Sequence, residues 1–129
     1  MPSLSAKTIK AGVIGWPVNH SLSPRLHGFW LDQYGIDGVY LRLAVTPENI
    51  EAALRALPKL GFAGANVTVP HKEAAFRIVD TLSDTAKKIG AVNTIVCAAD
   101  GTLRGDNTDA FGFISNINAA VPSFNAAAA

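Results

Sequence analysis

The stretch Gly64-Ala65-Asn66-Val67-Thr68-Val69-Pro70-His71-Lys72 decides the fold, because a strand pattern runs directly into a helix start. Residues 64–69 alternate between two kinds of side chain and include branched valines, which is typical of a strand. Pro70 suits the first turn of a helix, since its missing N–H is not needed there. A strand that passes straight into a helix predicts a protein of the α/β class.

The same alternation of strands and helices extends to both sides of this stretch. We predict strands at residues 9–14, 39–45, 64–69 and 91–98 with a short return strand at Leu103, and helices starting near Pro24, Thr46, Pro70, Ser83 and Asp106. Asp100-Gly101 predicts a type I′ hairpin turn between the last two strands. The order predicts a three-layer α/β sandwich, with a mostly parallel sheet and one antiparallel edge strand.

The first predicted helix has a polar start and one apolar face. Ser23 precedes Pro24 and is a natural N-cap. The apolar face of this helix comprises Leu26, Phe29, Trp30 and Tyr34.

Composition places the chain among ordinary globular proteins. Its 129 residues fit one domain, and 49% hydrophobic residues are enough to form a core. We expect that domain at residues 1–118, with 119–129 a linker or trimmed end that closes on four alanines. A net charge of +1, from scattered charges, argues against nucleic acid or an anionic membrane as the partner.

Location and cofactors are constrained by what the sequence lacks. Cys97 is the only cysteine, which excludes an internal disulfide and favours the cytoplasm. Neither a signal peptide nor an apolar stretch of about 20 residues is present, so we expect a soluble protein. The three histidines lack paired metal-ligand spacing, and no G-x-G-x-x-G, Walker or G-x-S-x-G motif occurs. We therefore expect no metal and no cofactor-binding residue in this chain.

Polar residues stand in places where packing alone does not require them. The hydroxyls of Ser21 and Ser23, just ahead of a helix, could hold an anion such as a carboxylate, although Ser23 could equally serve only as a cap. Asn66 and Thr68 share one face at the end of a strand, where α/β proteins often line a ligand cleft. Lys72 lies in the first turn of a helix, where the helix dipole disfavours a positive charge. That position suits either an exposed, tolerated lysine or one held for chemistry.

Two further polar residues follow later in the chain. Asn93 starts an apolar strand, where a buried amide needs partners; a satisfied turn amide is the simpler interpretation. Asp109 either complements a helix dipole or pairs with Lys72, and a carboxylate beside an amine can move a proton to or from a substrate hydroxyl.

In their order and spacing, four motifs together resemble the N-terminal domain of the shikimate dehydrogenase family over about residues 9–114. The motifs are Ser21-Leu22-Ser23-Pro24, Asn66-Val67-Thr68-Val69-Pro70 with Lys72, Ala91-Val92-Asn93-Thr94 and Gly105-Asp106-Asn107-Thr108-Asp109. Ala110 departs from the glycine often found at that place in the family. The resemblance implies an enzyme of aromatic amino-acid biosynthesis that reversibly reduces 3-dehydroshikimate to shikimate with NADP.

The resemblance also implies a role for each candidate residue. Ser21 and Ser23 would hold the substrate carboxylate, and Asn66, Thr68, Asn93 and Asp109 the ring substituents. Lys72 and Asp109 would form the catalytic pair, with Lys72 exchanging the hydroxyl proton and Asp109 orienting it. The helix start should ease deprotonation of Lys72.

The family's second, nucleotide-binding Rossmann domain is expected to be absent from this chain, which alone should be inactive and should not bind NADP well. Two other hypotheses remain. One is a quinate or dual quinate/shikimate dehydrogenase with the same motifs. The other is a binding module that captures a small polyhydroxy acid without chemistry.

Overall fold

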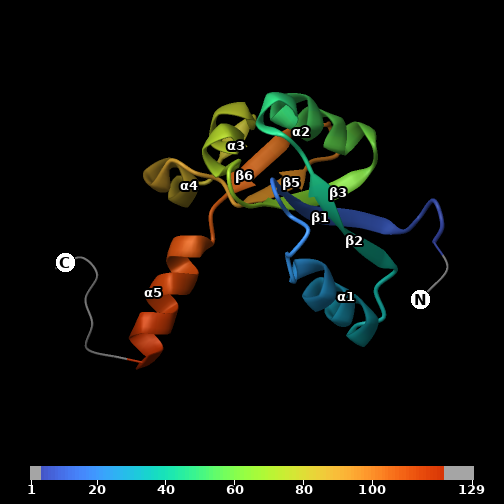
Figure 1. Ribbon diagram of the computed structural model, residues 1–129, viewed down its shortest axis with the longest axis horizontal. Coiled ribbons are helices and arrows are strands. Elements are labelled where there is room, and N and C mark those ends of the chain that lie inside the picture. Colours follow the sequence, from blue (N-terminus) through green and yellow to red (C-terminus); the bar gives the residue numbers. More distant parts are fainter. Residues whose placement is uncertain (1–3, 121–129) are drawn as a thin grey trace.

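The protein is described here by a computed structural model that covers residues 4–120 (Figure 1). Its elements are β1 (Ile9–Gly15), α1 (Ser23–Gln33), β2 (Gly38–Ala44), a 3-10 turn (Pro47–Asn49), α2 (Ile50–Lys59), β3 (Phe62–Val67), α3 (Lys72–Ile78), β4 (Thr81–Leu82), α4 (Asp84–Ile89), β5 (Thr94–Cys97), β6 (Leu103–Asp106) and α5 (Asp109–Ala120). The predicted linker at 119–129 lies outside the described residues, except that Ala119 and Ala120 end α5.

The six strands form one mixed sheet in the order β2-β1-β3-β5-β6-β4. β1 is parallel to β2 and β3, and β6 is parallel to β4, whereas β5 is antiparallel to both of its neighbours. The α/β class and the mostly parallel sheet are confirmed. The antiparallel strand, predicted at the edge, lies inside the sheet. The reversed strand is β5, which pairs with β3 on one side and with β6 on the other and is therefore enclosed by both. The two-residue strand β4, which is too short to leave a sequence pattern, pairs with β6 and takes the edge.

Helices α2, α3 and α4 cover one face of the sheet, and α1 lies on the other face near β2 (Figure 1). On the first face alternate residues of the strands meet the apolar stripe of α2. The largest side chains buried there are Ile14, Leu54, Ile95 and Leu103. We call this the core face, because it holds the main hydrophobic core of the described residues.

The opposite face is covered only in part, and we call it the open face. Helix α1 has no buried residue, and its predicted apolar side chains Leu26, Phe29, Trp30 and Tyr34 are all exposed. The helix itself is confirmed, but the burial that its pattern suggested is not found. Beside α1 the open face contains a mainly apolar hollow of about 330 Å³ over β1, β3 and β5.

Two local expectations about loops are corrected. The hairpin between β5 and β6 exists, but a type I′ turn needs a positive φ at Asp100, and among residues 4–120 only glycines have one. Instead, the Gly101 N–H donates to the Ala98 carbonyl and the Ala98 N–H to the Thr102 carbonyl, with Gly101 at φ +87°. This pattern matches a three-residue hairpin loop, in which glycine supplies the left-handed position. The second correction concerns Ser23, which begins α1 instead of capping it.

Candidate functional site

The sheet brings the candidate residues together at the edge where its parallel strands end, which is not the edge formed by an outermost strand. Parallel strands end at the same edge, so the segments that follow β1, β3 and β6 emerge together, and the reversed β5 begins there. Each candidate residue flanks one of these strand ends or the helix after it: Ser21, Ser23, Asn66, Thr68, Lys72, Asn93 and Asp109. Such an edge is where ligands bind in open α/β sheets.

Lys72 and Asp109 form the charged centre of this edge. They are the first residues of α3 and α5, and the distance from Lys72 Nζ to Asp109 Oδ2 is 2.6 Å. Their side chains are 34% and 53% exposed, so both can reach a ligand. The hydrogen bond from Lys72 holds the pKa of Asp109 below its usual value, a bond from Asn93 adds to this, and partial burial opposes it. Asp109 is therefore an ionised acceptor at neutral pH.

The side-chain amide of Asn93 holds Asp109 of this pair in place. Its side-chain Nδ2 donates to Thr108 Oγ1 and to Asp109 Oδ1, each at 2.9 Å. Its Oδ1 accepts from Thr94 Oγ1 at 2.9 Å and from the Thr108 N–H at 3.1 Å. The buried amide is thus satisfied, and it fixes the start of α5 and the Asp109 carboxylate.

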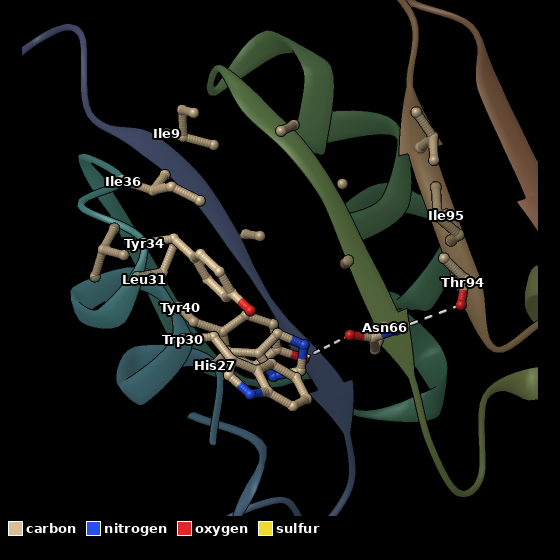
Figure 2. A pocket seen from close by; sticks show the side chains of 16 residues that line it. Ile9, His27, Trp30, Leu31, Tyr34, Ile36, Tyr40, Asn66, Thr94 and Ile95 are labelled. Carbon is tan, nitrogen blue, oxygen red and sulfur yellow. Dashed lines mark hydrogen bonds between the residues drawn. The ribbon is translucent and has the colours of Figure 1, made fainter. Parts of the chain in front are cut away.

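Asn66 and Thr68 lie on the open-face side of β3, as the alternation predicts. Asn66 Oδ1 accepts from the Tyr40 hydroxyl at 2.7 Å, and its Nδ2 contacts Thr94 Oγ1 at 3.4 Å (Figure 2). The Thr68 side chain lies over Gly15, where a Cβ would come within 2.5 Å of Thr68 Cγ2. A side chain at position 15 would therefore have to displace the Thr68 methyl group.

Ser21 and Ser23 lie in the loop between β1 and α1. Ser23 is the first residue of α1 rather than its cap, because Leu22 occupies the N-cap position without a side-chain bond. Ser21 Oγ instead accepts the Ser23 N–H at 3.2 Å. The loop is fixed by Arg42, which donates to the Ser21 carbonyl at 2.7 Å. Within residues 4–120 no hydrogen bond joins either serine directly to Lys72 or Asp109.

Three residues of the site region were missed from the sequence. His71 is buried, and its ring Nε2 lies 2.6 Å from the Val45 carbonyl oxygen, which ties the start of α3 to the end of β2. Tyr40 and Arg42 share a face of β2 opposite Val39, Leu41 and Leu43. That alternation is visible in the sequence. The residues that Tyr40 and Arg42 contact, Asn66 and Ser21, lie far from them along the chain.

The described residues give no sign of a metal or a membrane span. Residues 4–120 contain no cluster of histidine, cysteine and carboxylate side chains that could hold a metal ion. No helix in that range has the length and apolar character to cross a bilayer. A dinucleotide phosphate cradle is also not found in the sequence, which lacks G-x-G-x-x-G.

Several known proteins with a similar sequence and fold are named shikimate dehydrogenases. The family model "Shikimate dehydrogenase substrate binding domain" matches residues 13–95. A curated shikimate dehydrogenase (NADP(+)) of Paramagnetospirillum magneticum is 64% identical over 92% of this chain and 43% of its own length. The chain therefore spans less than half the length of that relative.

Two solved structures with a similar fold carry the same name. The shikimate dehydrogenase of Aquifex aeolicus has a TM-score of 0.88 at 40% identity, covering 93% of this chain and 45% of its own. The enzyme of Thermus thermophilus, solved with NADP(H) and shikimate, has a TM-score of 0.81 at 40% identity, covering 88% of this chain and 42% of its own. By its sequence, its fold and the edge of the sheet that carries its polar residues, this chain belongs to the family of shikimate dehydrogenase substrate-binding domains.

Proposed function

We propose that this chain is the substrate-binding part of an NADP-dependent shikimate dehydrogenase. The observation that carries the proposal is the contact of 2.6 Å between Lys72 Nζ and Asp109 Oδ2 at the sheet edge where strand ends converge. An amine beside an ionised carboxylate, next to amides and hydroxyls, suits proton transfer at a hydroxyl of a polar ligand. The relatives named above, which carry the name of that activity, support the same choice.

The chain's own residues would bind the substrate and handle one proton. The hydroxyls of Ser21 and Ser23 would hold a carboxylate, while Asn66, Thr68 and Asn93 would meet ring hydroxyls. In the direction of reduction, the Lys72 ammonium donates a proton to the carbonyl oxygen as it becomes a hydroxyl; in reverse, the neutral amine accepts it. Asp109 holds Lys72 in place and keeps the charge of the pair balanced.

The redox step belongs to the longer protein. When bound to the full-length enzyme, NADPH would supply the hydride for reduction and NADP+ would accept it in reverse, and the described residues offer no fitting site for the cofactor's phosphates. We therefore propose a nucleotide-binding domain as the partner of this domain and a cytoplasmic location, the latter in keeping with the single cysteine. Activity is expected only when both domains are present.

Ligand binding by residues 1–129 tests the first part of the proposal. Shikimate, then quinate, is titrated into the labelled chain while backbone amide NMR shifts are followed. Saturable shifts at Ser21, Thr68, Lys72, Asn93 and Asp109 support a formed site, and the tighter ligand identifies the preferred acid. A folded spectrum that neither acid changes at high concentration argues against substrate binding by this domain.

Replacement of Lys72 tests the second part, in the full-length protein. Lys72→Met keeps an unbranched side chain, one atom shorter than that of lysine, but removes the proton-carrying amine, so we expect kcat for NADP-dependent shikimate oxidation to fall by about 100-fold or more. Lys87→Met, on the exposed last turn of α4, is the matched control and should keep kcat within about two-fold. Equal rates for both variants would exclude Lys72 from the chemistry, and shikimate binding without oxidation by the wild type would favour a binding module.

A further inference from the structure

We propose that Tyr40 is a positioning residue of the substrate site, which fixes the orientation of the Asn66 side-chain amide from the neighbouring part of the sheet. The inference rests on the proposed function, because it concerns the same site. Tyr40 comes from β2 and Asn66 from β3, with β1 between them. The phenol therefore reaches across one strand to touch the amide (Figure 2).

The hydrogen bonds around Asn66 run in one direction. Tyr40 donates its hydroxyl proton to Asn66 Oδ1 at 2.7 Å. The Asn66 Nδ2 group points the other way, toward Thr94 Oγ1 at 3.4 Å. Thr94 in turn donates to Asn93 Oδ1 at 2.9 Å, and Asn93 donates to Asp109. A series of polar contacts thus leads from Tyr40 through Asn66, Thr94 and Asn93 to the Lys72–Asp109 pair.

An asparagine amide can occupy two orientations that differ by exchange of its oxygen and nitrogen. The phenol selects one of them, since its proton needs an acceptor and Asn66 Oδ1 lies within reach. The N–H₂ end of Asn66 is then turned toward β5, and its contact with Thr94 is long. One N–H of this group is consequently weakly engaged and available to a ligand oxygen at the sheet edge.

The phenol ring is itself held in place. The His27 ring of α1 stacks on it with centroids 4.0 Å apart and planes inclined by 7°. His27 Nδ1 lies 2.9 Å from the Ser23 carbonyl oxygen, and Trp30 meets the edge of His27 at 5.3 Å. Partial burial raises the pKa of Tyr40 to about 12, against the effect of a hydrogen bond with the Ser23 side chain. Tyr40 therefore remains a proton donor in its contact with Asn66 at physiological pH.

Tyr40→Phe in the full-length enzyme tests the proposal, because it removes the hydroxyl and keeps the stacked ring. Loss of one neutral hydrogen bond predicts a rise of about 3- to 10-fold in KM for shikimate. We expect kcat to change by less than about two-fold, and KM for NADP and the melting temperature to stay near those of the wild type. A purely structural role would instead lower the melting temperature and leave the KM ratio of the two substrates unchanged.

Tyr34→Phe is the matched control. Tyr34 lines the same hollow and is 71% exposed, and within residues 4–120 its hydroxyl makes no hydrogen bond. Its loss should leave both KM values as they are. The Asn66 side-chain N–H₂ signals should shift in the Tyr40→Phe spectrum and not in that of Tyr34→Phe, which reports the amide orientation without any substrate.

A double-mutant cycle shows whether Tyr40 acts through Asn66. In the Asn66→Ala background Tyr40→Phe should have no further effect on KM, whereas independent roles would give multiplied effects. The proposal is overturned if the effects multiply, or if Tyr40→Phe matches Tyr34→Phe in KM and in the Asn66 signals. A wild-type enzyme that does not oxidise shikimate would overturn the proposed function, while an unchanged Tyr40→Phe beside an active wild type overturns only the role of Tyr40.

Discussion

The two faces of the sheet differ in what they contribute to the protein. On the core face, α2 packs Leu54 against the strands with none of its side chain exposed, and Ile95 and Leu103 are buried beside it. On the open face, α1 buries no residue, and Val96, the neighbour of Ile95 on β5, is 51% exposed. The same strands therefore separate two tasks, since one side stabilises the fold and the other presents side chains.

Residues important for the site follow that division. Tyr40, Asn66 and Thr94 all lie on the open face and make polar contacts across the sheet. Changes on the core face should alter stability first and the site second. Changes on the open face should do the reverse, and variants on each face test that contrast.

Truncation of the core-face leucine should have the largest effect on stability. Leu54→Ala removes a fully buried side chain and leaves a cavity, which we expect to lower the free energy of unfolding by about 3 kcal/mol. Phe29→Ala on α1 removes a larger but 62% exposed side chain and should cost less than about 0.5 kcal/mol. Urea unfolding of the chain gives both values. Similar losses in the two variants would mean that the open face is as well packed as the core face.

The close backbone approach of β3 and β5 at Gly64 is an exception to this division, and addition of a methyl group there should have the next largest effect on stability. A Cβ at Gly64 would stand 2.2 Å from the Ile95 carbonyl oxygen, so Gly64→Ala must separate β3 from β5. We expect a loss of about 1–3 kcal/mol in the same urea experiment. Gly28→Ala is the control, since a Cβ there meets no atom within 4 Å. An unchanged midpoint for Gly64→Ala would show that the strands can move apart without cost.

Protonation of Asp80 at low pH should weaken its contacts with Leu103 and Arg55, and this effect on stability should be the smallest of the three. Asp80 accepts the Leu103 N–H at 2.7 Å and binds Arg55 at 2.9 Å, and these contacts lower the pKa of Asp80. A carboxyl whose pKa is lower in the folded state adds stability above its unfolded pKa of about 3.9 and loses it as pH falls through the folded value. Stability of the wild type should therefore decline more steeply below about pH 4 than that of Asp80→Asn. Thermal melts from about pH 6 to about pH 2 measure both slopes, and identical slopes would contradict the prediction.

Much of the fold could be predicted from local sequence. The apolar strand patterns and the helix predicted to start near Ser83 agree with the structure, in which Ser83 caps α4. β4 could not be predicted because its two residues carry no periodicity. The antiparallel strand was expected at the edge because a hairpin pattern does not reveal which of its two strands is reversed in the sheet, and in the structure it is β5, between β3 and β6. The exposure of the apolar side of α1 could not be predicted either, since a periodic pattern marks a face without saying what covers it.

The candidate site was predictable to the extent that its chemistry is local. The lysine at the start of α3 stood out because the helix dipole disfavours a positive charge there. The acid at the start of α5 allowed two interpretations, a complement to the dipole or a partner for Lys72, and the structure brings the two residues into contact. Their assigned roles in binding and catalysis remain predictions. Tyr40 and His71 depend on partners 26 residues away, and single-sequence patterns contain no information about such contacts.

The reversal of β5 within the sheet also determines when the site becomes ordered. Because β5 starts at the edge where β1, β3 and β6 end, separate segments of the chain meet there as soon as the sheet forms. The entropy lost in ordering them is lost during folding and not when a ligand arrives. Ligand affinity is then coupled to the folded population, so any variant that unfolds half of the molecules should halve the apparent association constant without touching a single binding group.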